Sequence, residues 1–323
     1  MGDPRLVVCP DADRFPMGDA DRRLAAESDL SLIEVHGHGI DSFRNHGRDA
    51  VGCLAWGGFY GSEVMDAMPR LRVLARCGTG TDNIDLTAAR ERGVVVTNVP
   101  GASDEEVSDH TIALVLSCLR MVVSSDAAIR RGEWPSAVQL ASMRRVRGTR
   151  LGLVGFGRIA SAVATKAAGL GMEVAAYDPF VPAETFHTRG VAQAPTMVAL
   201  LEHSDVISLH LPPSPDGRPI LGPEEFRAMR RGAVVINTGR GSLLDETCLH
   251  EALSSGQLSA AGLDVFQTEP LPIKSAFIGL DNVVLTPHSA AFSEQALFEI
   301  RQSALADAIA VLDGRTPSHP VQS

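Results

Sequence analysis

The sequence lacks long apolar runs, an excess of basic charge and the composition of a disordered chain. Its longest uninterrupted apolar stretches, such as residues 112–116, are far shorter than the roughly 20 residues that a membrane-spanning helix needs. The net charge of −10 argues against a nucleic-acid-binding surface, because such a surface requires a basic patch. Apolar residues make up 45% and charged residues 21% of the chain, which is a globular composition. A length of 323 residues suits two domains.

The start of the chain and the cysteines narrow the class of protein further. No apolar signal-peptide core follows Met1, and Leu6 stands where N-myristoylation requires Ser or Thr. The cysteines are odd in number, far apart and mostly in apolar stretches, which is typical of small core residues in a reducing compartment. They are Cys9, Cys53, Cys77, Cys118 and Cys248. We therefore expect a cytoplasmic protein that holds no metal and binds neither nucleic acid nor membrane.

Short apolar runs alternate with helical segments through most of the chain. The runs are continuously apolar, as expected of parallel strands that are covered on both faces. Long helices are predicted over 107–120, between two series of strands, and over 291–312. The pattern predicts an α/β protein with two doubly wound parallel-sheet domains. The expected strands are 6–9, 32–35, 51–55, 73–75, 94–97, 151–154, 173–177, 206–210, 233–237, 261–264 and 283–286.

A glycine-rich turn with the spacing of a dinucleotide-binding site follows the expected strand 151–154. Gly155 permits the tight turn, Gly157 lets the backbone approach a pyrophosphate, and Ala160 allows close packing of the following helix. Asp178 ends the next strand, where a carboxylate binds ribose hydroxyls and repels a ribose phosphate. The turn therefore predicts NAD rather than NADP. Alternatively, Asp178 only caps the turn before Pro179.

Three residues that are far apart in the sequence each follow an expected strand: Arg240, Glu269 and His288. Ligands of open α/β sheets bind at the carboxyl ends of the strands, so these side chains are expected to meet beside the cofactor. His288 is the natural acid/base for a hydroxyl proton, and Glu269 would fix its tautomer. Arg240 offers a bidentate fork for a substrate carboxylate. The alternatives are a loop salt bridge for Arg240 and Glu269, and a core position for His288.

Several motifs occur in the order found in one family, the D-isomer-specific 2-hydroxyacid dehydrogenases. They are CGTGTDNID at 77–85, NVPG at 98–101, the glycine turn, NTGRG at 237–241, LDVF at 263–266 before EPL at 269–271, and TPHS at 286–289. The chain resembles this family over nearly its whole length. The resemblance implies an NAD-dependent oxidoreductase that acts on a D-2-hydroxy or 2-oxo acid. It also implies a homodimer through the NAD domain.

The resemblance implies the domain organisation and the site residues as well. A Rossmann NAD-binding domain, residues 101–291, would be inserted in a flavodoxin-like substrate domain of residues 1–100 and 292–323. The catalytic set would be Arg240, Glu269 and His288. Substrate would also contact Trp56, Gly57, Gly78 and Thr79. Cofactor would contact Thr79, Gly155, Phe156, Gly157, Arg158, Ile159, Asp178, His210, Leu211, Pro212, Thr238, Gly239, Arg240, Asp264 and His288.

Two segments depart from the family pattern. Residues 212–218, PPSPDGR, replace a segment that usually carries Thr, which leaves the cofactor contacts there open. Residues 56–60, WGGFY, carry no Lys or Arg and follow an early strand. If this loop faces the substrate, it favours an apolar or uncharged tail over a phosphate; alternatively, its aromatic rings pack under their own loop. No regulatory domain is expected after the last helix, unlike in the longer phosphoglycerate dehydrogenases.

Other functions remain open at this point. Residues 104–111 and 289–299 are similar to the NADH-sensing C-terminal-binding co-repressors, which keep the same three catalytic residues. Phosphite oxidation can use the same triad. Formate dehydrogenase is disfavoured, because that branch has an amide in place of Glu269. Turnover of a 2-oxo acid separates the dehydrogenase from the sensor.

Overall fold

The computed structural model describes residues 5–214 and 216–321. Its chain forms two compact units: unit 1, Met1–Ser103 with Ser293–Ser323, and unit 2, Asp104–Phe292. The sequence analysis placed these boundaries at residues 100/101 and 291/292. The expectation about a leader sequence concerns Met1–Pro4, which lie outside the described residues. Pro215 of the 212–218 segment also lies outside them.

Unit 1 is built on a five-stranded parallel sheet in the order β2-β1-β3-β4-β5, which is the flavodoxin-like order. Buried apolar residues, many of them β-branched, line these strands and bury the sheet on both faces. The strands are β1 (Arg5–Cys9), β2 (Leu30–Glu34), β3 (Ala50–Ala55), β4 (Val73–Arg76) and β5 (Val95–Thr97). The helices are α1 (Asp19–Glu27), α2 (Ile40–His46), α3 (Ser62–Asp66), α4 (Leu86–Glu91) and α13 (Glu294–Leu312).

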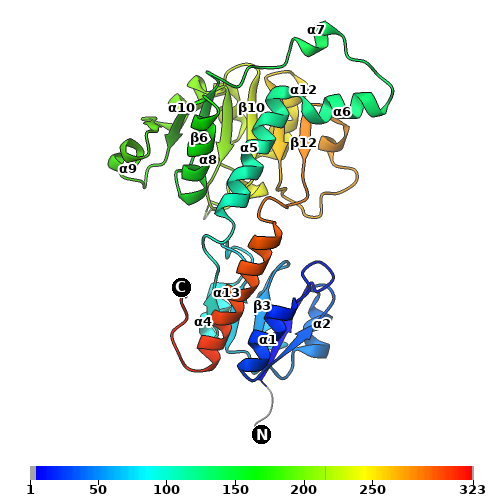
Figure 1. The fold of residues 1–323 in the computed structure, drawn as a ribbon, viewed down its shortest axis with the longest axis vertical. Coiled ribbons are helices and arrows are strands. Elements are labelled where there is room, and N and C mark those ends of the chain that lie inside the picture. The colour runs from blue at the N-terminus through cyan, green and yellow to red at the C-terminus, as the bar shows by residue number, and fades with distance from the viewer. Residues whose placement is uncertain (1–4, 215, 322–323) are drawn as a thin grey trace. The chain divides into compact units, whose positions relative to one another are not determined.

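The C-terminal helix α13 completes unit 1, although almost 200 residues separate it from β5. It packs along β3 and β4 (Figure 1). Ser293 caps its first turn by accepting from the backbone of Ala296. A buried carboxylate, Asp21 of α1, accepts from Arg301 Nε at 2.7 Å and from Gln302 Nε2 at 2.6 Å. These contacts fix α13 to α1 as well as to the sheet.

Unit 2 carries a seven-stranded parallel sheet in the order β12-β11-β10-β9-β6-β7-β8. This is the Rossmann order extended by one strand, so the predicted fold class of both domains is confirmed. The strands are β6 (Arg150–Val154), β7 (Glu173–Tyr177), β8 (Ala192–Gln193), β9 (Val206–Leu209), β10 (Ala233–Asn237), β11 (Leu258–Leu263) and β12 (Val283–Leu285). The helices are α5 (Asp104–Arg120), α6 (Val122–Arg130), α7 (Ala137–Leu140), α8 (Arg158–Gly169), α9 (Ala183–Thr188), α10 (Met197–His203), α11 (Pro223–Ala228) and α12 (Glu246–Ser254), with 3-10 turns η1 (Gly241–Leu243) and η2 (Ala276–Gly279).

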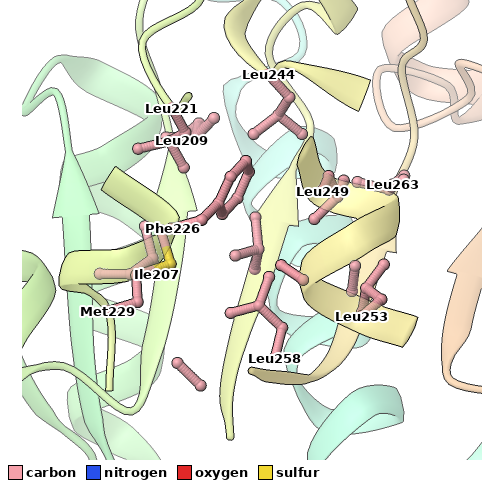
Figure 2. Packing of buried hydrophobic residues seen from close by; sticks show 14 of the residues in the cluster. Ile207, Leu209, Leu221, Phe226, Met229, Leu244, Leu249, Leu253, Leu258 and Leu263 are labelled. Atoms are coloured by element: carbon pink, nitrogen blue, oxygen red, sulfur yellow. The ribbon is translucent and has the colours of Figure 1, made fainter. Parts of the chain in front are cut away.

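Helices cover both faces of the unit 2 sheet (Figure 1). On one face, Phe226 and Met229 from the α11 segment pack with Ile207 of β9, and α12 contributes Leu249 and Leu253 (Figure 2). On the other face, α5 and α8 pack together on the strands through a second cluster of buried apolar side chains. The sheet is therefore buried on both faces. Ligands of such sheets bind at the carboxyl ends of the strands.

The expected elements differ from the observed ones mainly at their ends. Helix α5 begins at Asp104 rather than at 107, because the acidic residues before the apolar stretch form its first turn. Helix α13 begins at Glu294 rather than at 291, after the cap Ser293. Strand β8 was not expected: it has two residues, and both are exposed.

The structure also bears on membrane-spanning helices, on the cysteines and on metal binding. The described residues hold no single helix long and apolar enough to cross a membrane, and α5 with α6 pass that test only as a pair bent by 62°. The five cysteines are free, and four are buried. Burial raises the pKa of the Cys77 thiol to about 12, so this sulfur is an inert core atom. Within 5–214 and 216–321, no group of three His, Cys, Asp or Glu side chains is placed to hold a metal ion.

Candidate active site

The predicted site residues of unit 2 lie at the carboxyl ends of successive neighbouring strands. Asp178 follows β7, the glycine turn follows β6, and His210 follows β9. The series continues with Arg240 after β10, Asp264 after β11 and His288 after β12. From β7 to β12 the edge spans about 24 Å, at the usual spacing of ~4.8 Å between strands. One extended ligand along this edge would pass all six positions.

The glycine turn has the geometry that a dinucleotide pyrophosphate requires. Gly155 has φ +90°, and a Cβ there would lie 2.5 Å from the carbonyl oxygen of His210, so only glycine fits. A Cβ at Gly157 would meet nothing within 4 Å, and no side chain caps the N-terminus of α8. The first N–H groups of α8 therefore face open space at the positive end of the helix dipole. The turn fits the phosphates of the cofactor.

Asp178 lies beside this turn and braces it. Its Oδ2 accepts from the backbone N–H of Phe156 at 2.9 Å, and its Oδ1 accepts from the N–H of Phe180 at 2.9 Å. The carboxylate thus closes its own turn, as the alternative interpretation held. It also touches the glycine turn, and each oxygen keeps a second lone pair for a ribose hydroxyl.

The side chains of the glycine turn point away from the open space. Phe156 is buried and stacks on Phe186 with ring centroids 4.7 Å apart, and Ile159 packs against the same core. Arg158 forms a 2.8 Å ion pair with Asp104. The turn therefore presents its backbone to a ligand, and of the three side chains only that of Arg158 is largely exposed.

His210, Leu211 and Pro212 form the next wall of the edge. His210 Nε2 lies 2.9 Å from Ser208 Oγ, and burial lowers the pKa of His210 to about 4, so this imidazole is neutral near pH 7. The Leu211 side chain packs partly into the core, whereas Pro212 is exposed. The wall is therefore uncharged.

Glu269 and His288 form a close pair. His288 Nδ1 lies 2.6 Å from Glu269 Oε2, and Glu269 Oε1 accepts from the N–H of Phe266 at 2.9 Å. Burial raises the pKa of the Glu269 carboxyl most strongly, but the hydrogen bond and charge of His288, the Phe266 N–H and the charge of Arg240 together lower it. An ionised carboxylate only accepts, so Nδ1 carries the proton and donates it. The other ring nitrogen, Nε2, is left for proton transfer.

Arg240 is presented by a turn that Asn237 closes. Buried Asn237 accepts from Gly239 N–H at 3.0 Å and donates through Nδ2 to the carbonyl of Arg240 at 2.8 Å. Thr238 Oγ1 lies 2.9 Å from Thr111 Oγ1 of α5, which ties the same turn to the helix behind the sheet. The base of the Arg240 side chain is thus fixed by buried polar contacts.

Gly241 allows the Arg240 turn to approach the segment that carries Glu269. A Cβ at Gly241 would lie 1.9 Å from the carbonyl carbon of Phe266, a distance that no side chain tolerates. Phe266 in turn donates its N–H to Glu269. A glycine directly after Arg240 is therefore a packing requirement of the site.

Asp264 is fully buried and accepts several hydrogen bonds from the segment that carries His288. Its Oδ1 accepts from Thr286 Oγ1 at 2.6 Å and from Ser289 N–H at 2.9 Å, and its Oδ2 accepts from Ala290 N–H at 2.9 Å. Its backbone carbonyl accepts from His288 N–H at 2.8 Å. His288 has the left-handed φ of +51°, so these bonds hold a backbone conformation that is unfavourable for a non-glycine residue.

Sequence reasoning missed His110 of α5. Its Nε2 lies 2.9 Å from Thr286 Oγ1 and 3.6 Å from Asp264 Oδ1, so it extends the same network. One histidine among the polar residues of the first half of α5 carries no sequence signal for this role. The contact exists only because α5 crosses β11 and β12.

In unit 1, the 77–80 turn is held through its carbonyl oxygens. Arg76 donates to the carbonyls of Cys77 and Gly80, and the carbonyl of Gly78 accepts from Val99 N–H. Asn98 Nδ2 donates to the carbonyl of Thr79 at 2.8 Å. Gly78 has φ +147°. The turn is thus rigidly built around two residues predicted to bind substrate, Gly78 and Thr79.

The Trp56 ring is buried in unit 1, with 4% of the residue exposed. It stacks on Phe15 with centroids 4.2 Å apart, and Tyr60 is buried as well. The backbone N–H of Gly57 donates to Asp11 Oδ2 at 3.1 Å. The rings of Trp56 and Tyr60 pack inward, as the second of the two interpretations left open by the sequence has it, whereas Phe59 of the same loop is 64% exposed. Trp56 therefore offers its backbone rather than its ring.

Comparison with known proteins identifies the family to which this chain belongs. Residues 112–290 match the family model described as D-isomer specific 2-hydroxyacid dehydrogenase, NAD binding domain. A glyoxylate reductase of Korarchaeum cryptofilum is 38% identical over 262 residues, 80% of this chain and 79% of that protein. A D-3-phosphoglycerate dehydrogenase of Methanocaldococcus jannaschii is 38% identical over 72% of this chain, which spans only 44% of that protein.

A solved structure covers almost the whole chain. The TT0316 protein from Thermus thermophilus superposes with a TM-score of 0.88 at 36% identity, over 98% of this chain and 100% of that one. The residues that match the NAD-binding family model lie within unit 2. The chain belongs to the D-isomer specific 2-hydroxyacid dehydrogenase family and is an NAD-dependent enzyme of that family.

Proposed function

We propose that this enzyme reduces small 2-oxo acids to D-2-hydroxy acids, with His288 as the proton donor. The observation that carries the proposal is the 2.6 Å contact between His288 Nδ1 and Glu269 Oε2 on the carboxyl edge of the NAD-binding sheet. The nicotinamide, when bound, supplies the hydride. The protonated Nε2 of His288 gives its proton to the carbonyl oxygen of the substrate, and Glu269 stabilises the imidazolium before that transfer.

Arg240 is proposed to bind the substrate carboxylate. Its guanidinium is permanently charged and forked, and its charge already acts on Glu269, which supports its presence at the same site. In unit 1, the backbone N–H groups of Thr79 and Gly80 are proposed to bind the substrate, supported by the hydrogen bonds that fix this turn. The N–H groups of Cys77 and Gly78 already donate to the carbonyls of Ala55 and Arg76. Thr79, Gly57 and the backbone of Trp56 complete the proposed substrate contacts.

The proposed substrates have small, uncharged tails. The 56–60 loop carries no cation, and relatives are named glyoxylate reductase and hydroxypyruvate reductase. We expect NADH oxidation with glyoxylate and hydroxypyruvate at a higher kcat/KM than with phosphohydroxypyruvate or with branched and aromatic 2-oxo acids. The loss of NADH absorbance at several substrate concentrations measures this. Tight NADH binding without turnover on any of these acids would overturn the dehydrogenase proposal in favour of the co-repressor-like sensor.

We further propose a cytoplasmic homodimer through unit 2. Large apolar side chains are exposed on the α6–α7 segment: Val122 (54%), Ile129 (50%), Trp134 (88%) and Val138 (84%). These side chains lie on one segment, 122–138, among polar and charged residues, and a group of exposed large apolar side chains is typical of a protein–protein interface. In sedimentation velocity, the double variant Trp134→Glu, Val138→Glu is expected to shift the mass from a dimer to the 34.2 kDa chain. Val198→Glu, an exposed site on α10, is the control. A monomeric native protein contradicts the proposal.

A further inference from the structure

A hollow of about 320 Å³ opens at the amino ends of β6, β9 and β10, on the edge of the sheet opposite the glycine turn. Five arginines line it: Arg144, Arg145, Arg147, Arg230 and Arg231. The lining contains one acid, Asp205. This concentration of positive charge stands out in a chain whose net charge is −10.

Two segments far apart in the sequence build the hollow. Residues 144–147 carry three arginines just before β6, and Arg230 and Arg231 stand just before β10. Because β6, β9 and β10 are parallel neighbours, their starts lie on one edge. Asp205 N–H donates to the carbonyl of Arg150 at 2.8 Å, and Val234 N–H donates to the carbonyl of Asp205 at 3.0 Å. The sheet itself therefore holds the arginine segments together.

The protein neutralises only part of this charge. Asp205 lies 3.5 Å from Arg230 Nε, but it also pairs with Arg150 at 3.3 Å. Arg144 donates to the carbonyl of Gly232. Over the part of the chain that the structure describes, no carboxylate pairs with Arg145, Arg147 or Arg231. Their guanidinium groups stay charged at every physiological pH and repel one another across the hollow.

We propose that this hollow binds a small anion with at least two negative charges, of phosphoester or polycarboxylate chemistry. Guanidinium forks bind both oxyanions in bidentate fashion, and an anion between them relieves their mutual repulsion. The concave shape and the volume suit a small molecule, and the negative charge of the whole chain opposes a nucleic acid.

The anion site is separate from the cofactor site. Strand β6 starts at Arg150 beside the hollow and ends at Val154, directly before the glycine turn. Five residues of strand correspond to about 16 Å. An anion in the hollow therefore leaves the pyrophosphate position free, and the proposal is independent of which 2-oxo acid the enzyme reduces.

The test is isothermal titration calorimetry of the whole protein with pyrophosphate and, separately, with citrate. Saturating NADH is present in both titrations, so that neither probe reports from the cofactor site, and ionic strength is matched with NaCl. We expect one site per chain. The triple variant Arg145→Gln, Arg147→Gln, Arg231→Gln should weaken binding roughly tenfold or more, while NADH affinity and turnover stay at native values.

A matched control removes the same charge elsewhere in unit 2. Arg189→Gln, Arg218→Gln, Arg227→Gln changes three exposed arginines outside the hollow and is expected to bind as the native protein does. Tighter binding of pyrophosphate assigns a phosphoester ligand, and tighter binding of citrate assigns a polycarboxylate. No heat with either probe, or equal weakening in the two triple variants, overturns the proposal.

Discussion

Replacement of His288 by alanine is expected to lower kcat by roughly a hundredfold or more, while the affinity for NADH stays nearly native. The imidazole is the only side chain of the Arg240–Glu269–His288 set that transfers a proton near neutral pH. The glycine turn and Asp178, which fit the cofactor, lie at β6 and β7, away from His288 after β12. Single-turnover kinetics with fluorescence titration of NADH separate the two effects. Native turnover in this variant contradicts the assignment.

The companion variant is Glu269→Gln, which keeps the size of the side chain and removes its charge. The lowered pKa of Glu269 means that a carboxylate faces His288 at neutral pH and favours the protonated imidazole. Protonation of Glu269 at acidic pH removes this charge, so kcat of the native enzyme should fall as pH drops towards the lowered pKa of that carboxyl. The glutamine variant has no carboxyl to protonate, so its kcat should be low already at neutral pH and lack this acid limb, which the pH profile of kcat for NADH oxidation measures. The same acid limb in both proteins means that Glu269 does not act through His288.

Much of the fold was predictable because buried strands require apolar residues that are recognisable in the sequence. Strands covered on both faces require continuous apolar runs, so β6, β9 and β10 were identified within a residue or two. Strand β8 left no such mark, since Ala192 and Gln193 are exposed and pair only with β7. Helix starts were shifted where capping and acidic residues, rather than apolar periodicity, set the boundary.

The site was predictable where one topological rule applies. Residues that follow strands of a parallel sheet share an edge, which places Arg240, Asp264 and His288 at neighbouring strand ends. Contacts made by packing between elements were not predictable. The buried stacking of Trp56 on Phe15 and the reach of His110 to Thr286 depend on side-chain directions that no local pattern encodes.

Replacement of Asp264 by alanine is expected to lower both stability and turnover. The N–H groups of Ser289 and Ala290 lose their acceptor, whereas the Thr286 hydroxyl keeps His110 as a partner. Each unpaired buried group costs about 1–3 kcal/mol, so the free energy of unfolding should fall by about 2 kcal/mol or more. The left-handed backbone of His288 keeps its bond to the carbonyl of residue 264 but loses the side-chain bonds that hold the next two residues. A displacement of about 1 Å of a reacting group costs roughly a hundredfold in rate. Urea unfolding and kcat measure the two effects.

Two further variants separate a loss of stability from a loss of turnover that is caused by misplacement of His288. Asp264→Asn keeps one acceptor oxygen but sets an NH2 group against a backbone N–H, so it should fold and still lose turnover at least about tenfold. Asp307→Asn is the matched control, because Asp307 is a buried carboxylate of unit 1 that accepts from Ser318 N–H and contacts His319. It should lose stability and keep native kcat at temperatures where it is folded. If Asp264→Asn also keeps native kcat, Asp264 supports the fold of unit 2 and does not position His288 for proton transfer.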